Sequence, residues 1–265
     1  MPIVRSGEVN IHYQLCGEGE PLLLIMGFGM TGDMWLPSLP YFSGFRTAWF
    51  DNRGVGRSDQ PDSDYSIDDM VADAVAVLDD AGMERAHLFG VSMGGMIAQA
   101  LAIAHPERVN RLVLGCTSSG VASSHMPDPE VPLALLEAHA LLDSDLDAGV
   151  KLLIPLLFPD DFVAANGSLH EVVKMAVGMN TTPAATISKI MGGIMGFDVR
   201  DRLGGIAAPT LVIHGDEDRL IPIGAGREIA GAVPGAVMHE LSGAGHAFMV
   251  QKPDSHLTIA DFLAA

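Results

Sequence analysis

The feature that most constrains this fold is the alternation of short apolar runs with amphipathic helical segments. Residues 22–26 and 47–50 form apolar runs that end at a glycine and an aspartate, which is typical of strands buried on both faces. Since parallel strands need crossover connections, the alternation predicts an α/β protein with a mostly parallel sheet. The other expected elements are an antiparallel strand at 9–15, strands at 87–91, 109–114, 210–214 and 237–241, a helix between Ser66 and Gly82, and helices at 93–105 and 256–263.

The alternation stops between residues 120 and 197, where helical periodicity continues but no convincing strand appears. Prolines divide this segment into short helices, at Pro127, Pro129, Pro132, Pro155, Pro159 and Pro183. The simplest organisation is one α/β domain, residues 1–119 and 198–265, with residues 120–197 inserted as a helical cap. Because open α/β sheets bind ligands at the carboxyl ends of their strands, we expect the cap to lie over that edge.

Composition and charge exclude several classes of protein. The chain has 265 residues, of which 48% are apolar and 18% charged, so it can bury a large core and disorder is not expected. Its 33 acidic residues against 15 Lys and Arg give a formal charge of −18. Binding to nucleic acid or to an anionic membrane needs the opposite charge, so neither is an expected partner.

The sequence shows no targeting or membrane-spanning segment. The first residues lack the charged and then apolar pattern of a signal peptide, and no apolar run approaches the roughly 18–20 residues of a spanning helix. Cys16 and Cys116 are far apart and belong to no CxxC pair, so neither a metal centre nor a disulfide framework is expected. We therefore expect a cytoplasmic monomer or homodimer that uses no cofactor.

The most informative motif is Gly90-Val91-Ser92-Met93-Gly94, which lies between a predicted strand and a predicted helix. In this context the G-x-S-x-G pattern predicts a sharp turn that lifts the serine above the sheet as a nucleophile. The positions two residues before and after the serine must be small to avoid the neighbouring backbone. The helix amino terminus behind Ser92 would favour developing negative charge. A plain glycine-rich turn is the alternative interpretation.

A serine nucleophile needs a general base and a group that orients this base. Among the ten histidines, His246 stands apart because it lies in a glycine-rich loop directly after the strand at 237–241. Three acids follow the strand at 210–214, and of these we choose Asp218 as the orienting carboxylate. Asp216 is the alternative, and Glu217 is expected to be a solvated loop residue.

At these residues the sequence resembles the α/β-hydrolase superfamily, and within it the small, capped serine hydrolases. The resemblance covers nearly the whole chain, and the order Ser92, Asp218, His246 is the order of that superfamily. Residues 51–58 carry a further match, the D-x-R-G-x-G-x-S turn, which we interpret as structural, with Arg53 paired to a nearby carboxylate. The inserted segment matches the helical cap of the family.

The resemblance also implies an oxyanion hole made of two backbone N–H groups. One belongs to Met93, directly after the nucleophile, and the other to Phe28, in the loop after the strand at 22–26. Many relatives have His-Gly at the start of this loop, whereas this chain has Met26-Gly27. That departure changes the packing around the loop and leaves the backbone donor in place.

The expected activity is cleavage of small to medium, largely apolar carboxylic esters through an acyl-enzyme. The serine argues against dehalogenases and epoxide hydrolases of this fold, which attack with Asp. Carbon–carbon bond hydrolases of the fold often have Trp after the histidine, and here Ala247 follows, so they are less expected. An enol-lactonase or other lactone hydrolase is the alternative. A perhydrolase or haloperoxidase side activity and a non-catalytic ligand receptor rank below it.

Candidate pocket residues come from the cap and from the loops near the nucleophile. Methionines spaced four apart in the cap would form a flexible apolar wall, although ordinary core packing gives the same spacing. The full set is Gly27, Gly29, Met30, Trp35, Met175, Met179, Met191, Met195 and Phe248. An anionic lactone would need a cation near the site, and the cap offers few, namely Lys151, Lys174 and Lys189.

Overall fold

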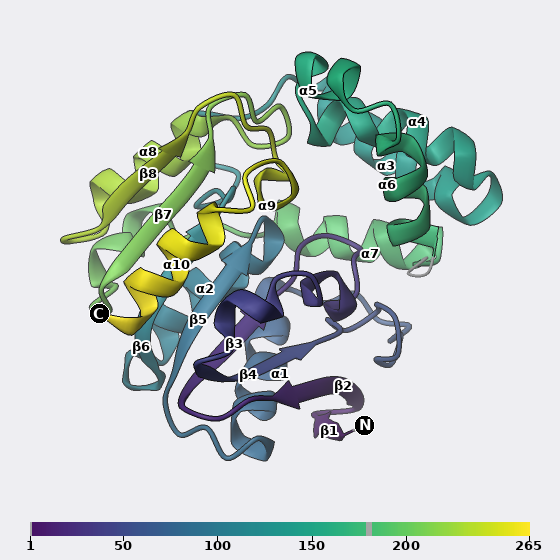
Figure 1. The fold of residues 1–265 in the computed structure, drawn as a ribbon. Coiled ribbons are helices and arrows are strands. Elements are labelled where there is room, and N and C mark those ends of the chain that lie inside the picture. The colour runs from purple at the N-terminus through teal and green to yellow at the C-terminus, as the bar shows by residue number, and fades with distance from the viewer. Residues whose placement is uncertain (1, 179–181) are drawn as a thin grey trace.

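The computed structural model describes residues 2–178 and 182–265, and an eight-stranded sheet forms its centre (Figure 1). The strands are β1 (Ile3–Ser6), β2 (Val9–Cys16), β3 (Glu20–Ile25), β4 (Phe45–Phe50), β5 (Ala86–Val91), β6 (Val109–Gly115), β7 (Thr210–Gly215) and β8 (Val237–Leu241). Their order across the sheet is β1-β2-β4-β3-β5-β6-β7-β8. The pairs from β4 to β8 are parallel, whereas β1 and β2 are antiparallel to their neighbours. The α/β fold class with a mostly parallel sheet is therefore confirmed.

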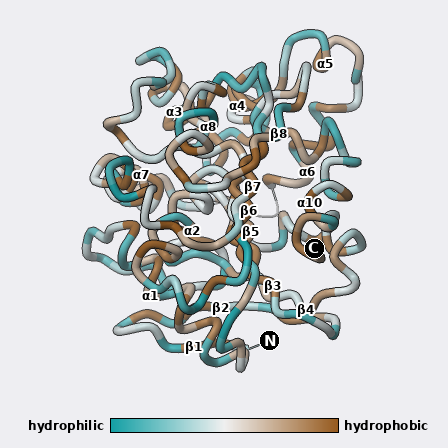
Figure 2. The backbone as a smooth tube through the Cα atoms, turned by 90° about the vertical axis from the view of Figure 1, so that its left-hand side faces the viewer, coloured by the Kyte–Doolittle hydropathy of each residue, from teal (hydrophilic) through white to brown (hydrophobic). Residues whose placement is uncertain are grey.

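Both faces of the sheet are buried, as the continuous apolar runs require. Along β3, Leu23 and Ile25 point into one apolar cluster and Leu22 and Leu24 into another. The first cluster is covered by α1 (Ile67–Asp80), α2 (Met93–Ala104) and α8 (Ile223–Ala232), and the second by α10 (Ser255–Ala264). Figure 2 shows α1 and α2 on one side of the strands and α10 on the other. The central strands are therefore packed against helices on both faces of the sheet.

Among the described residues, five α-helices stand between β6 and β7 in the chain, and we call them the inserted helices. They are α3 (Glu130–Ser144), α4 (Leu146–Leu157), α5 (Asp160–Ala165), α6 (Leu169–Gly178) and α7 (Ala184–Met195). Helices α3, α4 and α6 share an apolar cluster of their own, which includes Leu142, Leu153 and Val173. Gly120 and Asp198 form an isolated bridge, so the chain leaves and re-enters the sheet layer at neighbouring points.

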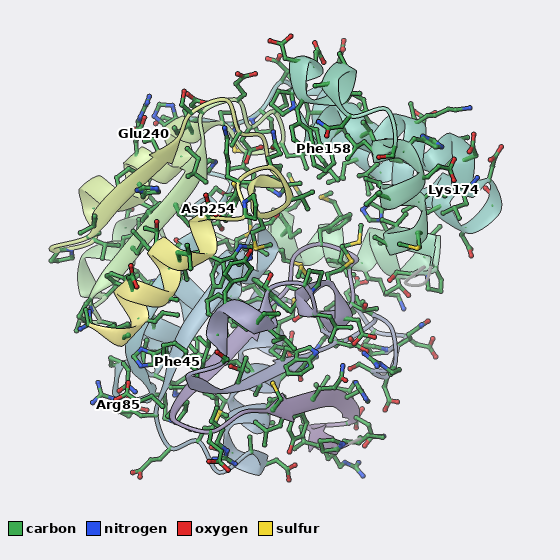
Figure 3. All side chains as sticks on the ribbon, viewed as in Figure 1. Phe45, Arg85, Phe158, Lys174, Glu240 and Asp254 are labelled. Atoms are coloured by element: carbon green, nitrogen blue, oxygen red, sulfur yellow. The ribbon has the colours of Figure 1, made fainter. Side chains whose placement is uncertain are left out.

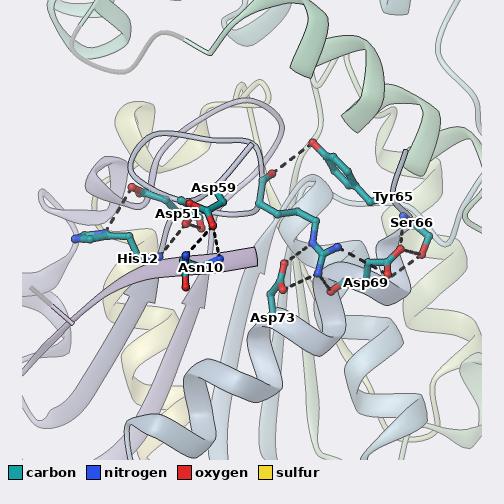
Figure 4. A network of polar contacts seen from close by, with 10 residues as sticks. Asn10, His12, Asp51, Asp59, Tyr65, Ser66, Asp69 and Asp73 are labelled. Carbon is teal, nitrogen blue, oxygen red and sulfur yellow. Dashed lines mark hydrogen bonds and ion pairs between the residues drawn. The ribbon is translucent and has the colours of Figure 1, made fainter. Parts of the chain in front are cut away.

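The turn after β4 is tied into the core by charged side chains. Arg53 donates two hydrogen bonds to the buried Asp73 carboxylate, at 2.6 and 2.7 Å, which confirms the expected pairing (Figure 4). Gly54 has φ +83° and Gly56 has φ +56°, which are backbone conformations that residues with a Cβ rarely adopt. Ser66 and Asp69 form the capping box that begins α1.

Two elements that the sequence did not predict, β1 and α8, have physical explanations. Strand β1 is a short, mostly exposed edge strand, so it carries little of the apolar pattern that marks the others. Helix α8 has two glycines, Gly224 and Gly226, among its first four residues, and glycine is a poor helix former. A Cβ at Gly226 would press on the His214 ring, and one at Gly224 would collide with His125. These glycines serve close packing, which local propensity does not reveal. The short α9 (Phe248–Gln251) was also not predicted.

Candidate active site

Ser92 lies at the junction of β5 and α2 in a backbone conformation that is rare for a residue with a side chain. Its φ is +56° and its ψ is −124°. A Cβ at Gly90 would collide with the carbonyl of Gly94, and a Cβ at Gly94 with the carbonyl of Ile25. The glycines therefore let two strands and a helix meet at one point, which is the packing that the motif requires.

His246 and Asp218 meet at the carboxyl ends of β7 and β8. His246 Nδ1 lies 2.7 Å from Asp218 Oδ2, while the other carboxylate oxygen accepts the N–H groups of Leu220 and Ile221, each at 2.9 Å. Burial alone would raise the pKa of Asp218, but the charge of His246 and hydrogen bonds from His214 and His246 outweigh it and hold this pKa well below its usual value. The carboxylate is therefore ionised beside the imidazole.

The alternative acid, Asp216, points elsewhere. It is exposed, and its Oδ1 accepts the backbone N–H of Gly243 at 2.7 Å. Its carboxylate thus stabilises the loop before His246, and the structure brings only Asp218 of the two acids to the imidazole.

Two neighbours of the pair were not singled out by the sequence, although both stand at strand ends. His214 Nε2 lies 3.3 Å from Asp218 Oδ2 and 2.8 Å from the carbonyl of Ile221. Cys116, directly after β6, is buried at a positive φ of 44°. Burial and the Asp218 carboxylate raise the pKa of the Cys116 thiol well above its usual value, so it is not a competing nucleophile.

Cys116, Asp218 and His246 also form the one group of at least three possible metal ligands among the described residues, with ligand atoms within 4.8 Å of one another. An ion bound there would have to replace the hydrogen bond between Asp218 and His246. The arrangement therefore suits a proton-transfer pair better than a metal site.

Two cavities meet at Ser92. The first has a volume of about 210 Å³ and lies between the sheet edge and helices α3, α4 and α6. Ser92 and His246 both line it, together with the predicted pocket residues Gly27, Met30 and Phe248. The second has a volume of about 340 Å³ and lies toward α7, and the candidate pocket residues Met191 and Met195 are among those that line it.

Three other candidate pocket residues lie elsewhere. Trp35 is fully buried in the core against Phe89, with ring centroids 4.9 Å apart. Met175 is 66% exposed on the outer side of α6. Gly29 lies behind the cavity, packed against α3 and α7. Met179 lies outside the described residues.

The loop after β3, which carries Phe28, is fixed at both ends by the turn after β4. The Asn52 side chain donates to the carbonyl of Met26 at 3.0 Å, and Asp51 Oδ1 accepts the N–H of Gly32 at 2.8 Å. A Cβ at Gly27 would lie 3.1 Å from Ser92 Cβ, so the loop passes directly beside the serine. Met93 is the first residue of α2, where a helix leaves its N–H groups unpaired.

The walls of both cavities are uncharged apart from histidine, because the described residues that line them include no Lys, Arg, Asp or Glu. Lys151 and Lys174 pair with Asp147, and Lys189 donates to two backbone carbonyls. Figure 3 shows Lys174 on the outer side of the inserted helices. The three lysines of the inserted helices, which could have paired with an anionic substrate, therefore pair with other groups of the protein outside the two cavities.

His139 of α3 is a buried titratable group of the first cavity that the sequence did not single out. Burial in these apolar surroundings lowers its pKa from 6.5 to about 4, so its imidazole is neutral at pH 7. No local pattern distinguishes it from a surface histidine, because its position depends on how α3 packs over the sheet.

The chain is similar to known proteins over nearly its whole length. The sequence profile of the alpha/beta hydrolase fold family matches residues 20–253. The chain belongs to this family. A relative from Azorhizobium caulinodans, whose name assigns it to the RutD carbamate hydrolases, is 30% identical over 96% of this chain and 94% of its own length.

A second relative and a solved structure extend the comparison. The 2-hydroxy-6-oxononadienedioate/2-hydroxy-6-oxononatrienedioate hydrolase of Burkholderia vietnamiensis is 32% identical over 92% of this chain and 87% of its own. The enol-lactonase of Burkholderia xenovorans LB400 has a TM-score of 0.86, with 26% identity and full coverage of both chains. In the described part of the chain, no helix is long and apolar enough to cross a membrane.

A first prediction concerns the turn at the serine. Gly94→Ala should lower the free energy of unfolding by about 3 kcal/mol, because the added methyl group meets backbone atoms that have no room to move. Gly204→Ala is the matched control, since nothing lies within 4 Å of its added Cβ. Urea unfolding of both variants gives the comparison. Equal stability would show that the turn relaxes around a side chain.

A second prediction concerns His139 and pH. Between pH 6.5 and about 4 the unfolded chain binds a proton at His139 that the folded chain does not, so this residue destabilises the fold as pH falls through that window. His139→Leu removes the effect. The stability of wild type relative to this variant should therefore fall by about 1 kcal/mol per pH unit over the window and stay constant above pH 7. A difference that is constant throughout, measured by urea unfolding, would contradict the burial of a neutral imidazole.

Proposed function

We propose that this protein is a serine hydrolase that cleaves neutral, largely apolar carboxylic esters through an acyl-enzyme. In this proposal Ser92 is the nucleophile, His246 the general base and acid, and Asp218 the carboxylate that orients His246. The observation that carries it is the hydrogen bond between the buried Asp218 and His246, at 2.7 Å, beside the cavity that Ser92 also lines. Family membership and the names of the relatives support a hydrolase.

The chemistry runs in two halves. Ser92 Oγ attacks the ester carbonyl carbon while His246 Nε2 takes the hydroxyl proton, and the oxyanion accepts hydrogen bonds from the N–H groups of Phe28 and Met93. The intermediate then collapses, and His246 returns the proton to the departing alkoxide, which leaves as an alcohol. Water, deprotonated by His246, attacks the acyl-serine in the same way and releases the carboxylic acid.

The electrostatics of the pair suit this cycle. When His246 holds the proton it is an imidazolium, and its charge is balanced by the Asp218 carboxylate at 2.7 Å. The depressed pKa of Asp218 keeps this carboxylate ionised rather than sharing the proton, and its hydrogen bonds from Leu220 and Ile221 fix its orientation. His246 therefore returns the proton to the leaving group and not to the acid.

The two cavities support the choice of substrate. An ester has an acyl and an alcohol side on either side of the attacked carbon, and Ser92 lines two cavities that could each take one side, the first lined from α4 and α6 and the second from α7. Their walls are apolar and hold no Lys or Arg among the described residues. The dicarboxylate named for the Burkholderia vietnamiensis relative would leave its charges without partners there. Neutral esters fit the walls better.

A lactone is the second candidate substrate. The likeness to the enol-lactonase structure, over the whole of both chains, favours it, and ring opening uses the same steps at the serine. Because the leaving alcohol stays attached to the acyl group, a lactone would fill one cavity rather than two. The uncharged cavity walls favour a neutral lactone over an anionic one.

The test is hydrolysis of p-nitrophenyl hexanoate. Wild-type protein should release p-nitrophenolate, and Ser92→Ala should lower kcat at least about 10³-fold with its melting temperature retained, because removing the nucleophile leaves only binding and oxyanion stabilisation. Ser188→Ala, an exposed serine on α7, is the matched control and should keep full activity. Equal rates in the Ser92→Ala and wild-type proteins would end the proposal.

A further inference from the structure

The first cavity contains a polar group that the proposed mechanism does not use. His139 is 3% exposed, and it lines this cavity together with Ser92 and His246. Within the described residues, the ring packs edge to face against the aromatic side chain of Phe28 and borders the cavity. Buried polar groups are normally hydrogen-bonded, so a buried imidazole on an otherwise mostly apolar wall offers a hydrogen-bonding position to a bound substrate.

The protein packs closely around this ring. The Phe28 and His139 rings meet edge to face at 5.0 Å. A Cβ at Gly29 would lie 3.0 Å from His139 Cε1 and 3.2 Å from Nδ1, so the loop that carries Phe28 has a glycine where the imidazole comes close. The carbonyl of Gly29 accepts a hydrogen bond from Thr182 at 3.0 Å, which holds the loop against the segment before α7. The imidazole is therefore packed beside the loop that carries Phe28, the residue expected to supply one N–H group of the oxyanion hole.

The rest of the cavity wall offers a substrate little else to hydrogen-bond. Apart from Ser92, His246 and the thiol of Cys116, the other described side chains of this wall are apolar. A neutral imidazole has one N–H donor and one ring-nitrogen acceptor. It can therefore bind an oxygen of an uncharged group, whereas a carboxylate would need a cation that the wall does not provide.

We propose that His139 determines substrate specificity by hydrogen-bonding a neutral polar atom, such as an ether, hydroxyl or ketone oxygen, in the part of the substrate that fills the first cavity. This inference rests on the proposed function of Ser92. A site built to hydrogen-bond a substrate group rejects the analogue that lacks it, because the protein group then stays buried and unpaired. The expected substrate is thus apolar along most of its length with one oxygen at the position of His139.

The experiment compares matched pairs of esters. Each pair has a straight-chain p-nitrophenyl alkanoate and its analogue in which one methylene is replaced by an ether oxygen, a hydroxymethylene or a ketone, at successive positions. A second series places the same changes in the alcohol of an alkyl butyrate. In wild type we expect at least one oxygenated ester to exceed its methylene partner about tenfold or more in kcat/KM, and His139→Leu should remove that preference.

Two further variants separate a specific contact from a structural role. His139→Gln keeps a donor and an acceptor and should retain part of the preference. His170→Leu removes a histidine of α6 that does not line the first cavity and should leave the preference unchanged. His139→Leu should also melt at or above the wild-type temperature at pH 7.5, since it replaces a buried imidazole in apolar surroundings by an apolar side chain.

The outcomes distinguish this inference from the function on which it rests. Absence of ester hydrolysis in wild type, or activity that survives Ser92→Ala, would overturn the proposed function itself. Hydrolysis with the same oxygen-to-methylene ratios in wild type and His139→Leu would overturn the role of His139 alone. A fall in melting temperature of His139→Leu with unchanged ratios would assign the residue to packing instead.

Discussion

The site depends on one strained turn of backbone at Ser92. A residue with a side chain at φ +56° costs on the order of 1–3 kcal/mol, and the surrounding structure must hold it in place. The serine N–H donates to the carbonyl of Gly115 at 2.8 Å, and the serine carbonyl accepts from Thr117 at 2.7 Å. Gly115 is the last residue of β6 and Thr117 follows it by two residues, so the turn is fixed by the end of the neighbouring strand and the loop after it. The parallel sheet, its two covered faces and the glycines of the motif together keep the side chain at the cavity wall.

The charge distribution separates the exterior of this protein from its cavities. The chain carries a formal charge of −18, yet the described walls around Ser92 have no carboxylate or cation. Asp218 is the buried acid next to them, and its charge faces His246 and His214 rather than the cavity. A neutral substrate would therefore meet little electrostatic opposition inside, whereas the acidic surface would repel anions before they enter. This supports uncharged esters over the dicarboxylates handled by one relative.

The sheet and the candidate site could be predicted because each depends on short sequence patterns, and each of these patterns lies within a single stretch of the chain. The runs at β3, β5 and β7 are buried on both faces, and the order Ser92, Asp218, His246 places each residue just after a strand. Long-range packing explains the misses. Trp35 looks like a pocket residue because it follows the loop after β3, but its ring turns into the core against Phe89. His139 lies in the cavity only because α3 folds back over the sheet, and no residue near it in sequence signals that contact.

The central claim is that Ser92 is a nucleophile activated by His246 and Asp218. Its most direct test is covalent trapping with a p-nitrophenyl alkylphosphonate ester, which reacts with an activated serine and loses p-nitrophenolate. Peptide mapping by mass spectrometry should find a single phosphonyl adduct, on Ser92. Its formation should slow by at least about a hundredfold in His246→Ala, because the general base is lost. An adduct on another residue, no adduct, or an equal rate in His246→Ala would contradict the account.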